Sequence, residues 1–322
     1  MIAMSKRSLI FVLIGVAVLV YYVTAAILIW SYKHQPNATY KSKLIIMESM
    51  IRHYHDDEYH LSNDDITIKD KARHDYFDDL TKDDNLRKIC VLGIKLLHNY
   101  LHNHDSDDLT TVRNIVDKVL TQTGSRTEGE TLDADKWELY IVDIPHFMAM
   151  YYLIVKDDSS NTARLTHCYE YINSVINSNM ESTCLNSTPS KTDFIKIGAP
   201  YLLTNYIRSL EDENCLKLYE KARKNNNLEL LNKYLSYDTS DEVKEIYGVL
   251  SVDGETKLKS KPAEALKCFD LMNKTIKYKD MYIAVYNTLD VPGNLWKSLL
   301  NLFEIIQKFW PTGWLSDMIY DS

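Results

Sequence analysis

The stretch WELYIVDIPHFMAMYYLIV, residues 137–155, is apolar almost all round. A helix at the surface of a domain keeps one polar face, so a helix without such a face is predicted to lie buried between other helices. Pro145 interrupts the stretch, and proline has no backbone N–H with which to continue a helical hydrogen-bond ladder. We therefore predict a buried central helix that starts or kinks at Pro145.

Amphipathic helical patterns lie on both sides of this stretch. They cover residues 86–103 and 109–121, the second with Asp107 or Asp108 as its predicted N-cap. Further helices are predicted at 163–177, 193–210, 215–224, 228–237, 241–250, 262–276, 279–289 and 295–309. Seven Pro and nine Gly are too few for a β-rich chain with many turns. The sequence thus predicts an all-α fold, in which residues 44–322 form an α/α toroid-like array of helical hairpins.

Residues 9–30, LIFVLIGVAVLVYYVTAAILIW, contain no charged side chain. A helix of about 20 apolar residues is long enough to cross the hydrocarbon core of a bilayer. We predict an uncleaved single-pass membrane anchor within residues 1–30, in contact with lipid, followed by a polar spacer over residues 31–43. The alternative is a secretory signal peptide cleaved close to Ala25.

The formal net charge of −8 is spread unevenly along the chain. Residues 1–30 carry +2 and residues 187–322 carry −1, which leaves −9 on residues 31–186. An acidic surface of this kind repels the phosphate backbone of nucleic acid. We predict no nucleic-acid partner and expect any anionic ligand to be met by the second half of the domain.

Neither the histidines nor the cysteines form a recognised metal or redox motif. Residues 53–60, HYHDDEYH, lack a ligand spacing, and His98 and His102, one helical turn apart, are predicted to mark a solvated helix end. The five cysteines are widely spaced and contain no CxxC. They are either buried free thiols or partly disulfide-bonded. We predict no metal and no cofactor.

Three stretches stand in the order found in the helical domain of one enzyme family. The first joins Trp137 to Pro145, the second is Thr-Cys-Leu-Asn ending at Asn186, and the third is Ile-Tyr-Gly around Tyr247. Here the chain resembles polysaccharide lyases of the hyaluronate and chondroitin lyase type, which include membrane-anchored envelope proteins of baculovirus occlusion-derived virions. The resemblance covers roughly residues 40–320 and rests more on order and spacing than on identity.

The resemblance implies a role for one residue in each stretch. Trp137 would form part of a sugar platform, Asn186 would bind the uronate carboxylate, and Tyr247 would be the base that removes the C5 proton in a β-elimination. Each residue also has an ordinary structural interpretation. Trp137 and Tyr247 are then core or rim residues, and Asn186 is a loop residue.

The sequence departs from the family where the catalytic groups are concentrated. Asp238 or Thr239 stands where the family has His, and no Arg follows Arg223, although the family supplies a catalytic Arg late in this domain. A Tyr with an ordinary pKa near 10 needs such cations to act as a base at neutral pH. We expect a membrane-anchored viral envelope protein with a degenerate lyase-like domain, non-catalytic and either glycan-binding or structural. The alternative is a working glycosaminoglycan (chondroitin or hyaluronan) lyase, completed by another chain.

The location follows from the same resemblance. An apolar N-terminal span followed closely by Lys33 is similar to the sorting signal of such envelope proteins. This similarity implies a viral envelope, or the inner nuclear membrane of an infected host cell. It leaves the partner envelope proteins open.

Overall fold

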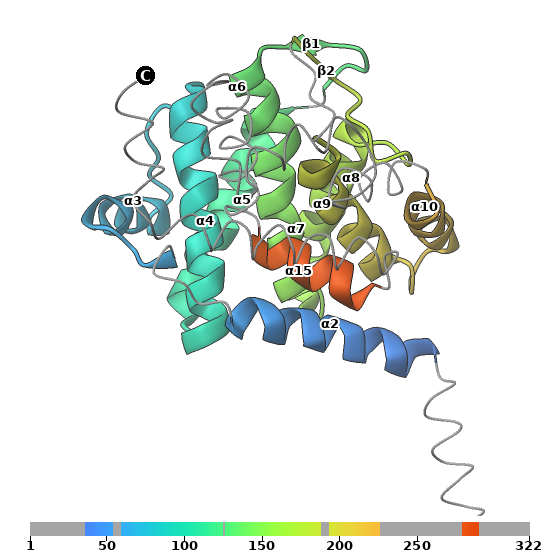
Figure 1. Ribbon diagram of the computed structural model, residues 1–322. Coiled ribbons are helices and arrows are strands. Elements are labelled where there is room, and N and C mark those ends of the chain that lie inside the picture. Colours follow the sequence, from blue (N-terminus) through green and yellow to red (C-terminus); the bar gives the residue numbers. More distant parts are fainter. Residues whose placement is uncertain (1–35, 54–58, 125, 188–192, 226–278, 290–322) are drawn as a thin grey trace, which may run out of the picture. The chain divides into compact units, whose positions relative to one another are not determined.

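The computed structural model describes residues 36–53, 59–124, 126–187, 193–225 and 279–289, and these residues are mostly helical (Figure 1). The predicted all-α class is confirmed at this level. The predicted anchor over residues 9–30, Tyr247, and the helices predicted at 228–237, 241–250, 262–276 and 295–309 lie outside the described residues.

The chain divides into two compact units, Met1–Ile45 and Ile46–Ser322. The boundary falls inside α2 (Pro36–His53). All contacts described below lie within the second unit.

The second unit is built from consecutive helical hairpins. α4 (Asp83–Asn103) packs against α5 (Ser106–Thr123), α7 (Ile144–Val155) against α8 (Thr162–Val175), and α9 (Asp193–Arg208) against α10 (Glu213–Arg223). Helix α7 also packs against α4 and α9, and α15 (Lys279–Thr288) packs against α9. The hairpins therefore lie side by side, with α7 between α4 and α9 (Figure 1).

Helix α7 forms the centre of the core, as the sequence predicts. All of its residues except Ile154 are buried, and Pro145 stands in its first turn. Among the described residues, one helical stretch, Ala134–Val155, is long and apolar enough to cross a membrane, but it lies mostly inside the domain. The approach of α4 to α7 is close, because a Cβ at Gly93 would lie 2.3 Å from Phe147 Cε2.

Helix starts follow local capping chemistry. Ser62 and Asp65 form a capping box at the start of α3 (Asn63–Arg73), and Asp212 caps α10. The prediction of Asp107 or Asp108 as the N-cap of α5 is wrong. The cap is Asp105, whose carboxylate accepts a hydrogen bond from the Asp107 N–H at 2.9 Å. Asp107 and Asp108 lie in the first turn instead, where a negative charge interacts favourably with the helix dipole.

Helix α3 is held on α4 and α5 mainly by charge, since Ala72 is its one buried residue. Asp65 pairs with Lys95 at 2.7 Å. Burial raises the pKa of Asp65, but hydrogen bonds from Lys95 and Ser62 outweigh burial and hold the pKa below its ordinary value. The other pairs that bind α3 and the turn after it are Lys69–Asp108, Arg73–Asp107 and Asp75–Lys118. The carboxylates of these four pairs are thus matched by cations of α3, α4 and α5.

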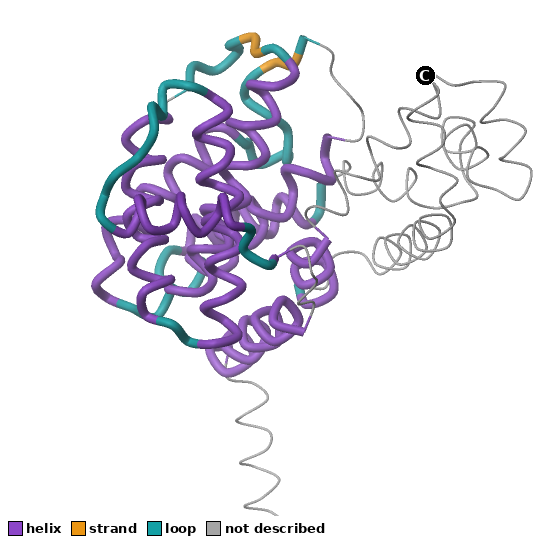
Figure 2. The backbone as a smooth tube through the Cα atoms, turned by 90° about the vertical axis from the view of Figure 1, so that its left-hand side faces the viewer, coloured by secondary structure: helices purple, strands orange, loops and turns teal. Residues whose placement is uncertain are grey.

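Two short strands close one end of the helical bundle. β1 (Thr131–Leu132) and β2 (Leu185–Asn186) pair in parallel, and both views place them at the same end (Figures 1 and 2). After β1 come the short helix α6 (Ala134–Trp137) and a π-helical turn, η2 (Glu138–Asp143), which leads into α7. A 3-10 turn, η3 (Ser159–Asn161), joins α7 to α8. The four described cysteines are buried free thiols.

Candidate functional site

Pro145 explains the π-helical turn before α7. In η2 the Ile144 N–H donates to the Leu139 carbonyl five residues back. The next donor in that ladder would be the N–H of residue 145, directed at the Tyr140 carbonyl, and proline has none. The Tyr171 hydroxyl of α8 donates to this carbonyl instead, at 2.8 Å. Single π-turns of this kind often occur at functional sites.

The π-helical turn directs three side chains to partners on other elements. Glu138 pairs with Lys196 of α9 at 3.0 Å, and Tyr140 donates to Asp83 at the start of α4 at 2.9 Å. Asp143, which is buried, accepts from Arg87 of α4 at 3.2 Å. The turn is therefore fixed from both sides, and the direction of the Tyr140 side chain is set by the fold.

Trp137 lies in the core. It ends α6 and is 3% exposed, with the Lys196 ammonium 5.8 Å from its ring centre. Lys196 is itself buried and paired with Glu138. A sugar platform needs an open aromatic face, which Trp137 does not present in this arrangement. Its predicted sugar-binding role would require the Lys196–Glu138 pair to open.

Asn186 is brought beside the Trp137 segment by the strand pairing. It lies opposite Leu132 in the β1–β2 register, and α6 packs against β2. Backbone bonds fasten the two loops together: Gly129 N–H to the Thr183 carbonyl at 2.8 Å and Ser187 N–H to the Leu132 carbonyl at 3.1 Å. Two of the three predicted site residues thus come from adjoining segments. The third, Tyr247, lies outside the described residues.

A polar cleft of about 450 Å³ opens along β1, next to these segments. Residues from the start of α4, the loop before β1, β1 itself, α6 and η2 line it, and its ionisable members are Asp83, Arg126, Glu130, Asp133, Lys136 and Tyr140. Asp133 also caps α6 by accepting from the Lys136 N–H at 2.8 Å. The Asp133 side chain is therefore held at the start of α6.

A tyrosine stacked with an arginine forms the most specific feature of this cleft. The guanidinium carbon of Arg126 lies 3.8 Å from the Tyr140 ring centre, and its Nη1 lies 3.2 Å from Glu130 Oε1. Burial raises the pKa of Tyr140, the hydrogen bond and charge of Asp83 raise it further, and Arg126 opposes them. Tyr140 therefore stays protonated at neutral pH and acts as a hydrogen-bonding group, not as a base.

Sequence reasoning missed Asp83, Arg126 and Tyr140. Tyr140 stands between Trp137 and Pro145, in a stretch that is predicted to be buried, and Arg126 is the single Arg in the polar loop of residues 122–136. These positions in the sequence are weak indications of a binding site. Their meeting depends on contacts between segments that are far apart in the chain.

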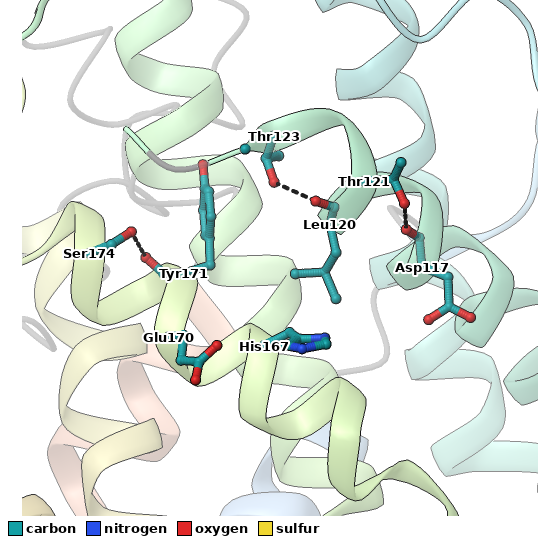
Figure 3. A pocket seen from close by; sticks show the side chains of 9 residues that line it. Asp117, Leu120, Thr121, Thr123, His167, Glu170, Tyr171 and Ser174 are labelled. Atoms are coloured by element: carbon teal, nitrogen blue, oxygen red, sulfur yellow. Dashed lines mark hydrogen bonds between the residues drawn. The ribbon is translucent and has the colours of Figure 1, made fainter. Parts of the chain in front are cut away.

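A larger cleft, about 710 Å³, lies between α5 and α8 (Figure 3). The hydroxyls of Thr121, Thr123 and Ser174 donate to carbonyls of their own helices. Asp117 accepts two bonds of 2.7 Å from Arg164. With these polar groups occupied within the wall, we assign no ligand to this cleft.

No metal site is found among the described residues, where no three His, Cys, Asp or Glu side chains converge. The prediction of a solvated helix end at His98 is wrong. His98 is buried, and its ring stacks on Tyr59 with ring centres 3.6 Å apart. Tyr59 belongs to the segment before α3, so only tertiary packing removes His98 from water.

The fold and the cleft define a class: an all-α domain of consecutive helical hairpins with a polar, aromatic-containing cleft at the end closed by β1 and β2. Comparison with protein families, with curated proteins and with solved structures finds no match to this chain.

Proposed function

We propose that this chain is a single-pass membrane protein of a viral envelope, or of the host inner nuclear membrane, whose helical domain binds a glycan without cleaving it. The observation that carries the binding role is the Arg126–Tyr140 stack in the cleft beside β1. Aromatic rings with fixed polar groups around them are the usual means by which a concave site orients a polar ligand. The resemblance to polysaccharide lyases supports a glycan as that ligand and a toroid-like closure of the hairpins.

The membrane role rests on residues 9–30, which have the length and composition of a spanning helix. Alkaline carbonate extraction tests it, because an uncleaved span stays with the membrane. We expect the full chain in the membrane pellet. A soluble product beginning near Ala26 would show instead that the segment is a cleaved signal peptide.

The absence of cleavage follows from the state of the tyrosines and from missing cations. β-Elimination needs a base to take the C5 proton, and general-base action contributes roughly 10²–10⁴-fold to rate. Tyr140 is held protonated. Tyr247, the base implied by the resemblance, has Asp238 or Thr239 near it in sequence where the family has His. An Asp there would raise the pKa of Tyr247 and not lower it.

Cleavage is tested by incubating the full chain, in a detergent that carries no sugar, with hyaluronan or with chondroitin. The unsaturated uronate product absorbs in the ultraviolet, and we expect no increase in absorbance above a protein-free control. Turnover that Tyr247→Phe abolishes would establish the alternative, a glycosaminoglycan lyase. Turnover unchanged by Tyr247→Phe and Asn186→Ala would show that the residues implied by the resemblance are not the catalytic ones.

Binding is tested by saturation-transfer NMR on the same protein with a panel of oligosaccharides. Arg126→Ala should weaken the transfer signal because it removes the guanidinium stacked on Tyr140, and Tyr140→Phe should weaken it because it removes the hydroxyl that bonds Asp83. Lys136→Ala and Lys217→Ala form a matched comparison, since both lysines are exposed and pair with an acidic residue on the same helix or its cap, but only Lys136 lines the cleft. Equal loss in both lysine variants would contradict a site at this cleft.

A further inference from the structure

The charges that line the cleft beside β1 indicate whether it accepts neutral or anionic glycans. Its lining cations are Arg126 and Lys136, and its lining carboxylates are Asp83, Glu130 and Asp133, which leaves a net charge of −1. A site for a polyanion would show the opposite excess, with cations left open to the ligand.

The two cations are already engaged by carboxylates of the cleft itself. Arg126 Nη1 lies 3.2 Å from Glu130 Oε1, and Lys136 Nζ lies 3.7 Å from Asp133 Oδ2. A uronate or sulfate would have to displace these carboxylates and would then face them as like charges at short range. A neutral sugar hydroxyl can bind without displacing these carboxylates, because each carboxylate oxygen has further lone pairs and each cation has further N–H donors.

Asp83 reinforces this preference. Its carboxylate accepts the Tyr140 hydroxyl at 2.9 Å and lies at the start of α4, where the helix dipole favours a negative charge. Asp83 therefore adds a formal negative charge to the lining of the cleft. The charge opposes an anionic ligand, whereas the same oxygens can accept hydrogen bonds from sugar hydroxyls.

The lining groups are also held in place before any ligand arrives. The β1–β2 bonds fix Glu130 and Leu132, since the Leu185 N–H donates to the Glu130 carbonyl at 2.8 Å and the Ser187 N–H to that of Leu132. Stacking fixes the Arg126 plane over Tyr140. Preorganised groups lose little entropy when they bind, which suits a ligand that offers only hydroxyls.

We propose that the cleft beside β1 is a subsite for an uncharged saccharide, such as a run of neutral hexose or N-acetylhexosamine units, and that it discriminates against uronate and sulfated chains. This inference rests on the proposed glycan-binding function and narrows its ligand class. Two ion pairs, the hydrogen bond from Tyr140 to Asp83 and the stacked Arg126–Tyr140 pair carry it.

The test compares an uncharged chito-oligosaccharide with a hyaluronan oligosaccharide of equal length. Binding to the full chain in sugar-free zwitterionic detergent is measured by titration calorimetry at about 0.05 M and about 0.5 M NaCl, where exposed charges are weakly and strongly screened. We expect the neutral oligosaccharide to bind with an affinity that changes little with salt, and the hyaluronan oligosaccharide to bind at least about tenfold more weakly at low salt.

Variants locate the binding. Arg126→Ala should weaken binding of the neutral oligosaccharide about tenfold or more, and the exposed Lys217→Ala should not change it. Lys136→Ala changes an exposed side chain of the cleft and should also weaken binding of the neutral oligosaccharide. Circular dichroism checks that each variant stays helical. Glu130→Gln should improve hyaluronan binding, since it removes a competing carboxylate from Arg126.

The outcomes separate the two proposals. If only hyaluronan binds, with an affinity that falls as salt rises, the neutral-saccharide inference is wrong and the glycan-binding function stands. If neither oligosaccharide binds, both are wrong. Neutral-saccharide binding that is unchanged by Arg126→Ala and Lys136→Ala would place the binding elsewhere and overturn the assignment of this cleft.

Discussion

The bond from Tyr171 to the Tyr140 carbonyl gives the sharpest test of the reasoning about η2. This carbonyl lacks a helical donor because Pro145 has no N–H, and the Tyr171 hydroxyl reaches it at 2.8 Å. Tyr171 is 6% exposed, so water has little access to its hydroxyl. Burial raises the pKa of Tyr171 well above its ordinary value, so the hydroxyl keeps its proton and remains a donor.

Tyr171→Phe keeps the ring and removes only the donor. A buried carbonyl left without a partner costs about 1–3 kcal/mol. For a domain of this size each kcal/mol lowers the melting temperature by about 2–4 °C, so the expected decrease is roughly 2–12 °C. Thermal unfolding of the full chain, followed by far-ultraviolet circular dichroism, measures it. Tyr76→Phe is the control, because Tyr76 is 76% exposed and its loss of a hydroxyl should change stability by less than about 0.5 kcal/mol.

A second substitution tests whether the missing proline N–H is the reason that the Tyr171 hydroxyl stabilises the domain. Pro145→Ala supplies a backbone N–H at the position where the ladder is interrupted, so in that background Tyr171→Phe should destabilise the domain less. The difference between the two backgrounds is a coupling energy. An unchanged melting temperature in Tyr171→Phe, or the same loss in both backgrounds, would refute the argument that the hydroxyl replaces the missing proline donor.

Three further predictions follow from the described contacts. Gly93→Ala should destabilise the domain by about 1–3 kcal/mol, because the new methyl meets the Phe147 ring; urea unfolding measures it, and Phe147→Leu in the same chain should recover part of the loss. Because the pKa of Asp65 is lowered by folding, its contribution to stability is present above its unfolded pKa of about 3.9 and is lost as the pH falls through the folded value. Amides of α3 should therefore lose hydrogen-exchange protection in that acidic range, and Asp65→Asn should remove this step. Asp83→Asn should lower the pKa of Tyr140, seen as earlier titration of its ring signals by NMR, and an unchanged or higher pKa would contradict the role of Asp83.

The helices could be predicted because their signals are local. Residues 193–210 and 279–289 correspond to α9 (Asp193–Arg208) and α15 (Lys279–Thr288) within two residues. A helix boundary does not follow from the sequence where several neighbouring residues offer the same capping chemistry. At the start of α5, three aspartates stand within four positions, and each could supply the capping oxygen.

The candidate site could be predicted only in part. The order of motifs in the chain, through the resemblance to lyases, predicts Trp137 and Asn186 as site residues, and the β1–β2 pairing brings their segments together. The cleft that forms there is instead centred on Arg126 and Tyr140. The Lys196–Glu138 pair covers Trp137. The residues around Trp137 in the sequence do not predict this pair, because Lys196 lies 59 positions further along the chain.

The sequence by itself determined which segments become helices, that residues 144–155 lie inside the domain, and that Pro145 interrupts the hydrogen-bond ladder. These properties depend on side-chain periodicity and backbone chemistry within a few residues. Tertiary structure decided which polar groups meet: His98 with Tyr59, Tyr171 with the Tyr140 carbonyl, and Asp83 with the Tyr140 hydroxyl. Such contacts join positions separated by tens of residues, and the chain can form them only after the helices have packed, since the entropy of closing long loops must be offset by burial of the core.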